Sequence, residues 1–531
     1  MSAQALMILG TASHVGKSVL TAALGRILSD EGFRVAPFKA QNMSLNSAVT
    51  PDGLEIGRAQ ALQAEACRVP ARAEMNPILI KPSSDTGAQV VVLGRVWGQV
   101  SAADYHQRRV EELWDVVLDS YKTLAREYEI ILIEGAGSPA EINLKAHDIV
   151  NMRMAQAAHA ACLLVGDIDR GGVFASLLGT VELLDSCERA LIRGFVVNKF
   201  RGDIELLRPG IAMIEERIQL HCAGVVHYFH DLGLDEEDSV SMESRRTVAC
   251  AWNGTAAHSE SPDRPLRIGV VAFPHMANFT DFDALAMEPS VALAFLERAE
   301  DVMSADILIL PGTKQTLQDL DWLERSGFFP AISEFRKQTA RAAIIGICGG
   351  MQMLGRVLED PGGVESDGRP RSARGLGLLP IATVLHAEKI TRRIQGRVQL
   401  ATLLGRPVAE RSFDGYEIHL GETIYDENAN PFSEITRAGN DDVLRDGAVS
   451  SDGFIFGTYV HGLFDDDSFR HSFVTAARPA RGLAPPRQIV FANADRQQRI
   501  DRFADHVRRA LDMSLIKSWL RPAGSGKKPA A

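Results

Sequence analysis

Residues 5–18 read ALMILGTASHVGKS, an apolar run followed by a loop that two glycines bound and that ends in Gly16-Lys17-Ser18. The apolar run predicts a buried strand, and residues 18–30 after it have helical spacing. Such a loop between strand and helix turns backbone N–H groups and a helix N-terminus toward an anion. Five residues separate Gly10 from Gly16, one more than in the common form of this loop. The stretch therefore predicts a phosphate site of slightly unusual spacing.

The side chains at the end of this loop predict the chemistry of the anion. A lysine at the position of Lys17 supplies a point charge to the β- and γ-phosphates, and the hydroxyl of Ser18 is a ligand for Mg²⁺. We expect ATP, bound with Mg²⁺, to contact Gly10, Thr11, Val15, Gly16, Lys17 and Ser18.

The same alternation of strand and helix continues along the chain. Apolar runs occur at 34–39, 130–137, 161–169 and 192–200, and a second series occurs at 266–273, 306–312, 343–350 and 453–464. Alternating β and α patterns favour parallel sheets covered by helices. We therefore predict an α/β protein with two doubly wound α/β domains: residues 1–240, a linker at 241–265, a second domain at 266–475, and a C-terminal helix with a disordered tail at 476–531.

Composition excludes several classes of protein. The 531 residues carry 57 Lys+Arg against 68 Asp+Glu, a net charge of −11, which argues against binding nucleic acid through bulk charge. The six cysteines include no C-x-x-C pair, so neither a disulfide framework nor a cysteine-rich zinc site is indicated. The N-terminus has no signal-peptide pattern, and no long apolar run suggests a membrane span. We expect a cytoplasmic protein.

Two carboxylates are candidate metal ligands beside Ser18. Glu134 ends the apolar run 130–134, where a parallel sheet presents its ligands. Glu55 is a weaker candidate, because an acid at the start of a helix also stabilises the helix dipole. Asn198, at the end of another apolar run, is expected to contact the ATP base, although a polar cap of the strand explains it equally well.

Polar residues after two other strands are candidate substrate ligands. Lys39, Gln41 and Asn42 follow the second strand, and their side chains suit phosphate or amide groups. Asp169 and Arg170 follow the strand at 161–167 and are candidates for substrate or metal contact. A structural ion pair beside a glycine turn is an equally good explanation of that acid and base.

A second kind of chemistry is indicated at Cys348, in the stretch AIIGICGG. A cysteine between an apolar strand and a helix, with small neighbours such as Gly346 and Gly350, is typical of a nucleophile elbow, and a helix N-terminus favours its thiolate. His461, at the end of the run 453–461, is our candidate base, and His419 is the second choice. The backbone N–H groups of Gly312 and Gly349 are the candidate oxyanion donors.

These motifs resemble known families. GICGGMQMLG (346–355) with a late YVHG (459–462) is similar to class I glutamine amidotransferases, whose cysteine releases ammonia from glutamine. That family usually has an acid two residues after the histidine, where this chain has Leu463, so the third member of the catalytic group must come from elsewhere. The N-terminal loop resembles that of dethiobiotin synthetase, which activates a carboxylate with ATP.

Together the two halves resemble the cobyrinic acid amidase group of the corrinoid (vitamin B12) pathway. The similarity is strongest to its cobyric-acid-forming branch, over roughly residues 5–475. It is carried by QNMSLNS (41–47), EIGRAQALQAEA (55–66), NPILIKP (76–82), GDIDRGGVFAS (166–176), NFTDFD (278–283) and PGTKQT (311–316).

The resemblance implies an amide ligase for the b, d, e and g carboxylates of adenosylcobyrinic acid a,c-diamide. Glutamine would supply ammonia, ATP would activate each carboxylate, and the corrinoid would be a substrate with no organic cofactor bound. Three alternatives stay open: a ligase for the a and c carboxylates or another polycarboxylate, a ParA/MinD-like nucleotide switch, and an inactive glutaminase domain used as a scaffold with free ammonia as donor. The switch is disfavoured because Ala12 stands where such proteins usually carry an extra lysine.

Overall fold

The computed structural model describes residues 3–82, 87–101, 110–230, 233, 261–338, 342–366, 368–408, 412–440 and 442–520. The chain divides into two compact units, the first made of Met1–Ser44, Glu55–Glu236 and Arg496–Ala531, and the second of Leu45–Leu54 and Glu237–Asp495. A short segment of the N-terminal half thus belongs to the second unit, and the C-terminal end belongs to the first. Residues 241–260 of the predicted linker and the predicted tail after residue 520 lie outside the described residues.

The first unit is built on a six-stranded parallel sheet of order β12-β11-β10-β1-β9-β2. Both inner strands beside the phosphate loop are buried along nearly their whole length, as is typical of a parallel sheet covered on both faces. The predicted doubly wound fold is confirmed here. The strands are β1 (Gln4–Gly10), β2 (Val35–Phe38), β9 (Ile130–Glu134), β10 (Ala161–Asp167), β11 (Ile192–Phe200) and β12 (His221–His227).

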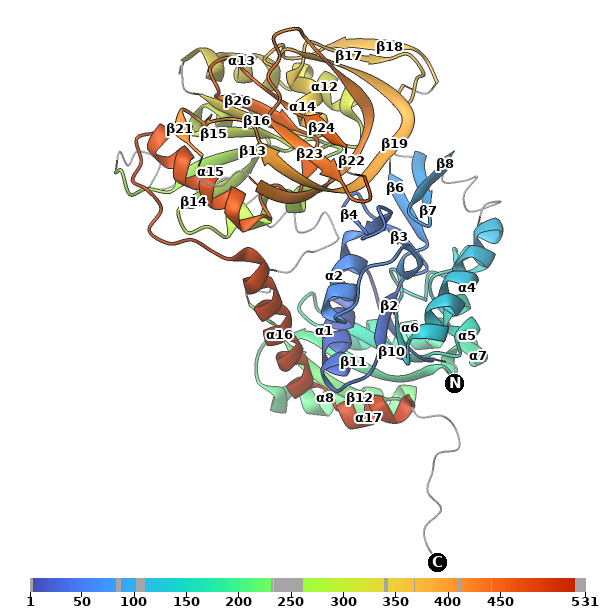
Figure 1. Cartoon of the computed structure of the whole chain (residues 1–531). Coiled ribbons are helices and arrows are strands. Elements are labelled where there is room, and N and C mark those ends of the chain that lie inside the picture. The colour runs from blue at the N-terminus through green and yellow to red at the C-terminus, as the bar shows by residue number, and fades with distance from the viewer. Residues whose placement is uncertain are drawn as a thin grey trace, which may run out of the picture. The chain divides into compact units, whose positions relative to one another are not determined.

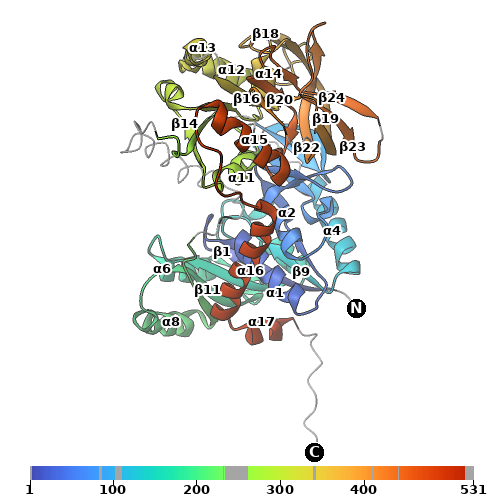
Figure 2. The ribbon, with the colours of Figure 1, turned by 60° about the vertical axis from the view of Figure 1, so that its left-hand side comes forward.

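Helices cover this sheet. The core on one face joins residues of α1, α16 and α17 to those of the central strands, and Figure 2 shows α16 beside α1. The helices of the unit are α1 (Lys17–Asp30), α2 (Arg58–Ala66), α4 (Val110–Glu127), α5 (Met152–Ala157), α6 (Val173–Leu183), α7 (Ser186–Arg189), α8 (Ile204–Ile218), α16 (Ala492–Ala510) and α17 (Met513–Trp519), with short 3₁₀ turns at Ala73–Met75 and Lys145–His147.

A fully buried arginine ties the C-terminal helix to the first unit. Arg26 on α1 is 0% exposed, and its guanidinium donates to Asp501 at 2.9 Å, to Gln497 at 2.7 Å and to the carbonyl of Ala66 at 2.9 Å. A buried guanidinium is costly unless its donors are paired. The C-terminal helix therefore completes the packing of an N-terminal one, which explains why the two ends of the chain share one unit.

A smaller four-stranded sheet of order β3-β6-β7-β8 stands beside the main sheet within the first unit (Figure 1). Its first strand carries Gln41 and Asn42, two of the predicted substrate ligands. The strands are β3 (Gln41–Met43), β6 (Ile78–Pro82), β7 (Gly87–Val92) and β8 (Arg95–Ser101), and the short strands β4 (Ser47–Val49) and β5 (Glu55–Gly57) complete the N-terminal half.

The second unit has its own six-stranded sheet, of order β14-β13-β15-β16-β26-β25. The first five strands are parallel, and four of them lie at the predicted apolar runs, whereas β14 lies outside them; the second α/β prediction is also confirmed. They are β13 (Leu266–Val271), β14 (Val291–Leu296), β15 (Ile307–Leu310), β16 (Ala343–Ile347) and β26 (Ile455–Thr458), with β25 (Ala448–Val449) antiparallel at the edge. The helices are α11 (Asp283–Ala286), α12 (Thr316–Arg325), α13 (Phe328–Gln338), α14 (Gly349–Leu354) and α15 (Asp467–Ala480), with 3₁₀ turns at Phe279–Phe282 and Ala299–Ser304.

A second, mostly antiparallel sheet in this unit is absent from the sequence-based prediction. The long antiparallel pair β19 and β22 forms the centre of this sheet, and β17, β18, β23, β24 and β27 extend it. The bounds are β17 (Val357–Asp360), β18 (Arg371–Arg374), β19 (Ile381–Val398), β22 (Ser412–Tyr425), β23 (Ser433–Arg437), β24 (Val443–Asp446) and β27 (Val460–His461); β20 (Thr402–Leu403) and β21 (Arg406–Pro407) pair separately. None of the described helices of the chain has the length and apolar character needed to cross a membrane.

Candidate active sites

The phosphate loop of the first unit joins β1 to α1 through a tight curve that needs both of its glycines. A Cβ added at Gly10 would lie 2.9 Å from the carbonyl oxygen of Ala12 and 2.8 Å from Nζ of Lys17. Gly16 caps α1 with a φ of 96°, in the left-handed region that other residues rarely adopt. The loop is therefore held in the curled form in which its N–H groups suit a phosphate.

The predicted ATP ligands lie around this loop. The backbone N–H of Thr11 donates to Val165 of β10 at 2.9 Å, which anchors the start of the loop to the sheet. Lys17 is 7% exposed, and its ammonium donates to the carbonyls of Ala12 at 2.9 Å and Gly137 at 3.0 Å. The lysine therefore lies across the loop, with its charge over the predicted phosphate position.

Asn198 and its neighbour hold the loop from the end of β11. The side-chain amide of Asn198 donates to the carbonyl of Val15 at 2.8 Å, and the ammonium of Lys199 donates to the carbonyl of His14 at 2.7 Å. Lys199 also pairs with Asp167 at 3.0 Å. The amide predicted to contact the ATP base is thus engaged with the phosphate loop, and supporting that loop is the role its geometry favours.

Glu134 and Ser18 come together as predicted for a metal site. The hydroxyl of Ser18 donates to Oε1 of Glu134 at 2.8 Å, and the same oxygen accepts from Nζ of Lys39 at 3.0 Å; Gln63 donates to the other oxygen at 2.5 Å. Burial raises the pKa of Glu134, but the charge of Lys39 and these hydrogen bonds outweigh burial and lower it below its usual range. The carboxylate is therefore ionised.

The other predicted ligands of the first unit are placed as follows. Glu55 is 1% exposed, and its carboxylate pairs with Lys81 at 2.6 Å. The side-chain amide of Asn42 donates to Gln60 at 3.0 Å, and Gln60 in turn lies 3.5 Å from Glu134. Gln41 is half-buried at the start of β3.

Asp169 and Arg170 do not form an ion pair with each other. Asp169 pairs with Arg201 at 3.0 Å, and its backbone N–H donates to Asp167. The side chain of Arg170 is exposed. Asp169 therefore forms a structural ion pair, as the alternative interpretation predicts. Its partner, however, is Arg201, which follows β11.

In the second unit, Cys348 stands at a strained turn between β16 and α14. Its φ of 52° and ψ of −113° lie outside the regions that non-glycine residues favour, as expected of a nucleophile elbow. The turn fits only small neighbours, because a Cβ at Gly346 would lie 2.6 Å from the backbone of Met351. The backbone N–H of Cys348 donates to the carbonyl of Thr458 at 2.8 Å, which anchors the elbow to β26.

His461 reaches this cysteine from β27, and an acid outside the expected position supports it. Nδ1 of His461 lies 2.6 Å from Oδ2 of Asp281, and the N–H of Gly462 donates to Oδ1 of the same carboxylate at 3.1 Å. Asn278 adds its amide nitrogen at 3.5 Å from Nδ1 of His461. The histidine, its acid and this amide are all buried. Cys348, His461 and Asp281 thus form the three-member arrangement of a thiol hydrolase.

The electrostatics of this group favour an ion pair between cysteine and histidine. Burial lowers the pKa of His461, but the charge and hydrogen bond of Asp281, with the hydrogen bond and charge of Cys348, outweigh it and raise the pKa to about 10. The imidazole is therefore protonated at neutral pH. A positive charge beside a cysteine favours the thiolate, the reactive form of such a nucleophile.

The two predicted oxyanion glycines flank the nucleophile. A Cβ at Gly312 would lie 3.0 Å from the ring of His461 and 3.6 Å from Cβ of Cys348, so this position is in contact with both. Gly349 is the first residue of α14, where helix geometry leaves the backbone N–H without an intrahelical acceptor. Both glycines therefore lie beside the atom at which negative charge would develop.

His419, the second candidate base, is placed on the other face of β22. Its ring stacks on Tyr459, with 3.7 Å between centroids, and Nε2 lies 3.5 Å from Glu417. Together with Arg437 these side chains line a pocket of about 560 Å³ whose lining does not include Cys348. His419 thus has an acid neighbour of its own, but the contact with Cys348 belongs to His461.

A buried carboxylate beside the elbow makes a testable contribution to stability. Asp446 accepts from the hydroxyl of Ser433 at 2.9 Å, the N–H of Tyr459 at 3.0 Å and the hydroxyl of Thr458. Burial raises its pKa to about 6, although the bonds from Thr458, Tyr459 and Ser433 act in the opposite direction.

Because the folded state holds the Asp446 proton more tightly than the unfolded state, this group lowers stability as pH rises from about 4 to about 6 and has no further effect above that. Asp446→Asn cannot ionise. We expect its free energy of unfolding, relative to the parent chain, to rise across this window by up to about 3 kcal/mol. Urea unfolding at a series of pH values measures this difference, and a difference that does not change with pH would contradict it.

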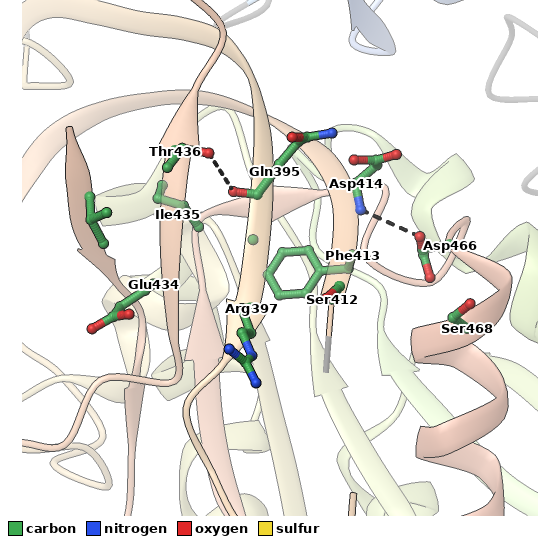
Figure 3. A pocket seen from close by; sticks show the side chains of 12 residues that line it. Gln395, Arg397, Ser412, Phe413, Asp414, Glu434, Ile435, Thr436, Asp466 and Ser468 are labelled. Atoms are coloured by element: carbon green, nitrogen blue, oxygen red, sulfur yellow. Dashed lines mark hydrogen bonds between the residues drawn. The ribbon is translucent and has the colours of Figure 1, made fainter. Parts of the chain in front are cut away.

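The surface pocket in Figure 3 has no part in either predicted site. It has a volume of about 560 Å³ and lies among β19, β22, β23 and the start of α15, with Phe413 beside Gly396. The dashed bonds run from Thr436 to the carbonyl of Gln395 and from the N–H of Asp414 to Asp466. Its lining includes none of the predicted site residues.

Two family models match the chain, in the order that the sequence predicts. The CobQ/CobB/MinD/ParA nucleotide binding domain matches residues 6–240, and the CobB/CobQ-like glutamine amidotransferase domain matches residues 267–469. These matches confirm the resemblance of each half. They also confirm that the phosphate loop and the Cys348 elbow belong to two different kinds of domain.

Relatives match over almost the whole length. Cobyric acid synthase of Moorella thermoacetica is 46% identical over 515 residues, covering 97% of this chain and 96% of the relative. That of Nitratidesulfovibrio vulgaris is 46% identical over 546 residues, covering 99% and 98%, and that of Thermoanaerobacter sp. is 45% identical over 514 residues, covering 96% and 97%. With both domains matched and this identity along the full chain, the protein belongs to the cobyric acid synthase family.

Proposed function

We propose that this chain forms cobyric acid by converting the b, d, e and g carboxylates of adenosylcobyrinic acid a,c-diamide into amides, with ATP as the activating agent and glutamine as the source of ammonia. The observation that carries the proposal is the 46% identity over nearly all of both chains to relatives named cobyric acid synthase. The presence of a complete thiol site and a complete phosphate loop on one chain supports it.

The glutamine half-reaction follows from the group around Cys348. The thiolate attacks the side-chain carbonyl of glutamine, and the N–H groups of Gly312 and Gly349 stabilise the oxyanion. The imidazolium of His461 then donates its proton to the departing ammonia, which leaves a thioester. Water, deprotonated by His461, hydrolyses the thioester to glutamate and restores the thiol, while Asp281 keeps the imidazole in one orientation.

The ATP half-reaction solves a different problem, because a carboxylate is a poor electrophile. The substrate carboxylate attacks the γ-phosphorus, ADP departs, and the product is an acyl phosphate. Ammonia then attacks the acyl carbon, and phosphate leaves. Lys17, whose ammonium is held over the loop by two carbonyls, is placed to neutralise the phosphate charge.

The residues at the phosphate loop fit a magnesium ion bound with the nucleotide. Ser18 and Glu134 offer a hydroxyl and an ionised carboxylate 2.8 Å apart, which are ligands that Mg²⁺ prefers. Among the described residues no three His, Cys, Asp or Glu side chains gather as a metal site, so phosphate oxygens and water would complete the coordination. When bound, the ion would neutralise charge on the transferring phosphoryl group.

The test is the mass of the corrinoid product. Adenosylcobyrinic acid a,c-diamide is incubated with Mg²⁺, ATP and glutamine labelled with ¹⁵N at the side-chain amide. We expect four labelled amides, formed only when ATP is present. An unchanged corrinoid in a reaction that still converts glutamine to glutamate would overturn the substrate and move the proposal to a ligase for another polycarboxylate.

A further inference from the structure

A segment of the N-terminal half belongs to the unit that contains the nucleophile. Leu45–Leu54 is part of the second unit, whereas the chain on both sides of it, Met1–Ser44 and Glu55–Glu236, belongs to the first. Within the segment Asn46 is 1% exposed and Ser47 is 0% exposed. Polar residues so deeply buried need hydrogen-bond partners. The partners of these two identify what the segment does.

Both residues bind the loop that supports the catalytic histidine. The N–H of Ser47 donates to Oδ1 of Asn278 at 2.9 Å, and Oδ1 of Asn46 accepts from the N–H of Phe279 at 3.2 Å. Asn278 has a φ of 53°, and its carbonyl accepts from the N–H of Asp281 at 3.0 Å. The segment therefore fixes the turn that brings Asp281 and the Asn278 amide to His461.

A second set of contacts reaches the other side of the histidine. The hydroxyl of Tyr416 donates to the carbonyl of Ser47 at 3.4 Å, and its ring stacks on His461 with 5.5 Å between centroids and 20° between planes. Val49 packs with Tyr416 and Ile418 in a small buried cluster. The segment thus contacts both the turn that carries Asp281 and Tyr416, whose ring stacks on the imidazole.

We propose that Asn46 and Ser47 are positioning residues of the glutaminase site. Their bonds to Phe279 and Asn278 hold the turn that carries Asp281. The carbonyl of Ser47 also holds Tyr416, whose ring stacks on His461. The imidazole therefore depends on this segment for its orientation.

The test uses the full chain and rests on the proposed glutamine hydrolysis at Cys348. Asn46→Ala removes the acceptor of the Phe279 N–H, and Thr50→Val is the matched control. Thr50 is equally buried, but its hydroxyl bonds with Asp52 and Leu54, which belong to the same segment. Three quantities are measured: amidation with glutamine, amidation with ammonium at alkaline pH, and the pH dependence of iodoacetamide alkylation at Cys348, followed by peptide mass.

We expect Asn46→Ala to lower glutamine-driven turnover about tenfold, the effect of losing one buried hydrogen bond from the active geometry. Ammonium-driven turnover should stay within about twofold, and the alkylation profile should move to higher pH. Thr50→Val should change none of these. An equal fall with both nitrogen donors, or an unchanged alkylation profile, would overturn the inference. A parent chain that hydrolyses no glutamine would overturn the proposed function itself.

Discussion

Replacing Cys348 with alanine should abolish glutamine-driven amidation and leave ammonium-driven amidation intact at alkaline pH. The variant lacks the only atom that can form the thioester, so we expect at least about a 10⁴-fold loss with glutamine. Ammonia supplied from solution bypasses this step, and the phosphate loop in the first unit is untouched by the change. Initial rates with each nitrogen source, measured by the amount of amidated corrinoid, give the result directly.

The control for this experiment is Cys187→Ala, because Cys187 is exposed and lies in the other unit. It should leave both rates unchanged. Retention of glutamine-driven activity in Cys348→Ala would remove the elbow from the mechanism. Loss of both activities in a folded variant would instead show that the two half-reactions are not separate. The scaffold alternative holds that free ammonia is the natural donor. It requires that the parent chain use glutamine no better than the variant.

Local patterns were sufficient to predict the two parallel sheets, the curled loop at Gly10–Lys17 and the sharp turn at Cys348. The run at 5–10 became a strand because a parallel strand covered on both faces is apolar throughout, and Gly10, Gly16 and Lys17 were identified from spacing that the curled loop requires. Cys348 was recognised for the same kind of reason, since its turn tolerates only glycine at the neighbouring positions. In each case the determining residues are close together in the sequence.

Features that depend on distant residues were not predictable in this way. The expected acid position two residues after His461 holds Leu463, which is 1% exposed and packs in the core. The acid that replaces it, Asp281, lies far earlier in the chain, in a turn that only tertiary packing brings to the histidine. Asp281 lies in the family motif NFTDFD (278–283), whose two aspartates are the sequence signal for an acid in this part of the chain.

The same limit applies to the partner of Glu55 and to the second sheet. Glu55 is followed by a helix, so its local pattern fitted both a metal ligand and a helix-start acid, whereas its buried partner Lys81 is distant in the sequence. The strands β19 and β22 are long and carry many charged residues on their open face, which obscures the alternation that marks a strand. The place of Leu45–Leu54 in the second unit likewise depends on contacts with distant residues, Asn278 and Tyr416.

Asp281→Asn should lower glutamine-driven turnover by about 10² to 10⁴-fold while leaving ammonium-driven turnover unchanged. Asparagine keeps an oxygen for the N–H of Gly462 but presents an amide where Oδ2 now faces Nδ1 of His461. The imidazole is then bound in the wrong tautomer, and it also loses the negative charge that raises its pKa against the effect of burial. The imidazolium of His461 is then less stable at neutral pH.

The matched control is Asp283→Asn, which neutralises a neighbouring acid at the start of α11. The readout that separates positioning from a general loss of structure is the rate of Cys348 alkylation across pH. In the parent chain and in Asp283→Asn this rate should reach half of its maximum at the same pH, and in Asp281→Asn at a higher pH. A glutamine-driven rate within about threefold of the parent would contradict the assignment, because an acid that holds the imidazolium in a buried site cannot be neutralised at so small a cost.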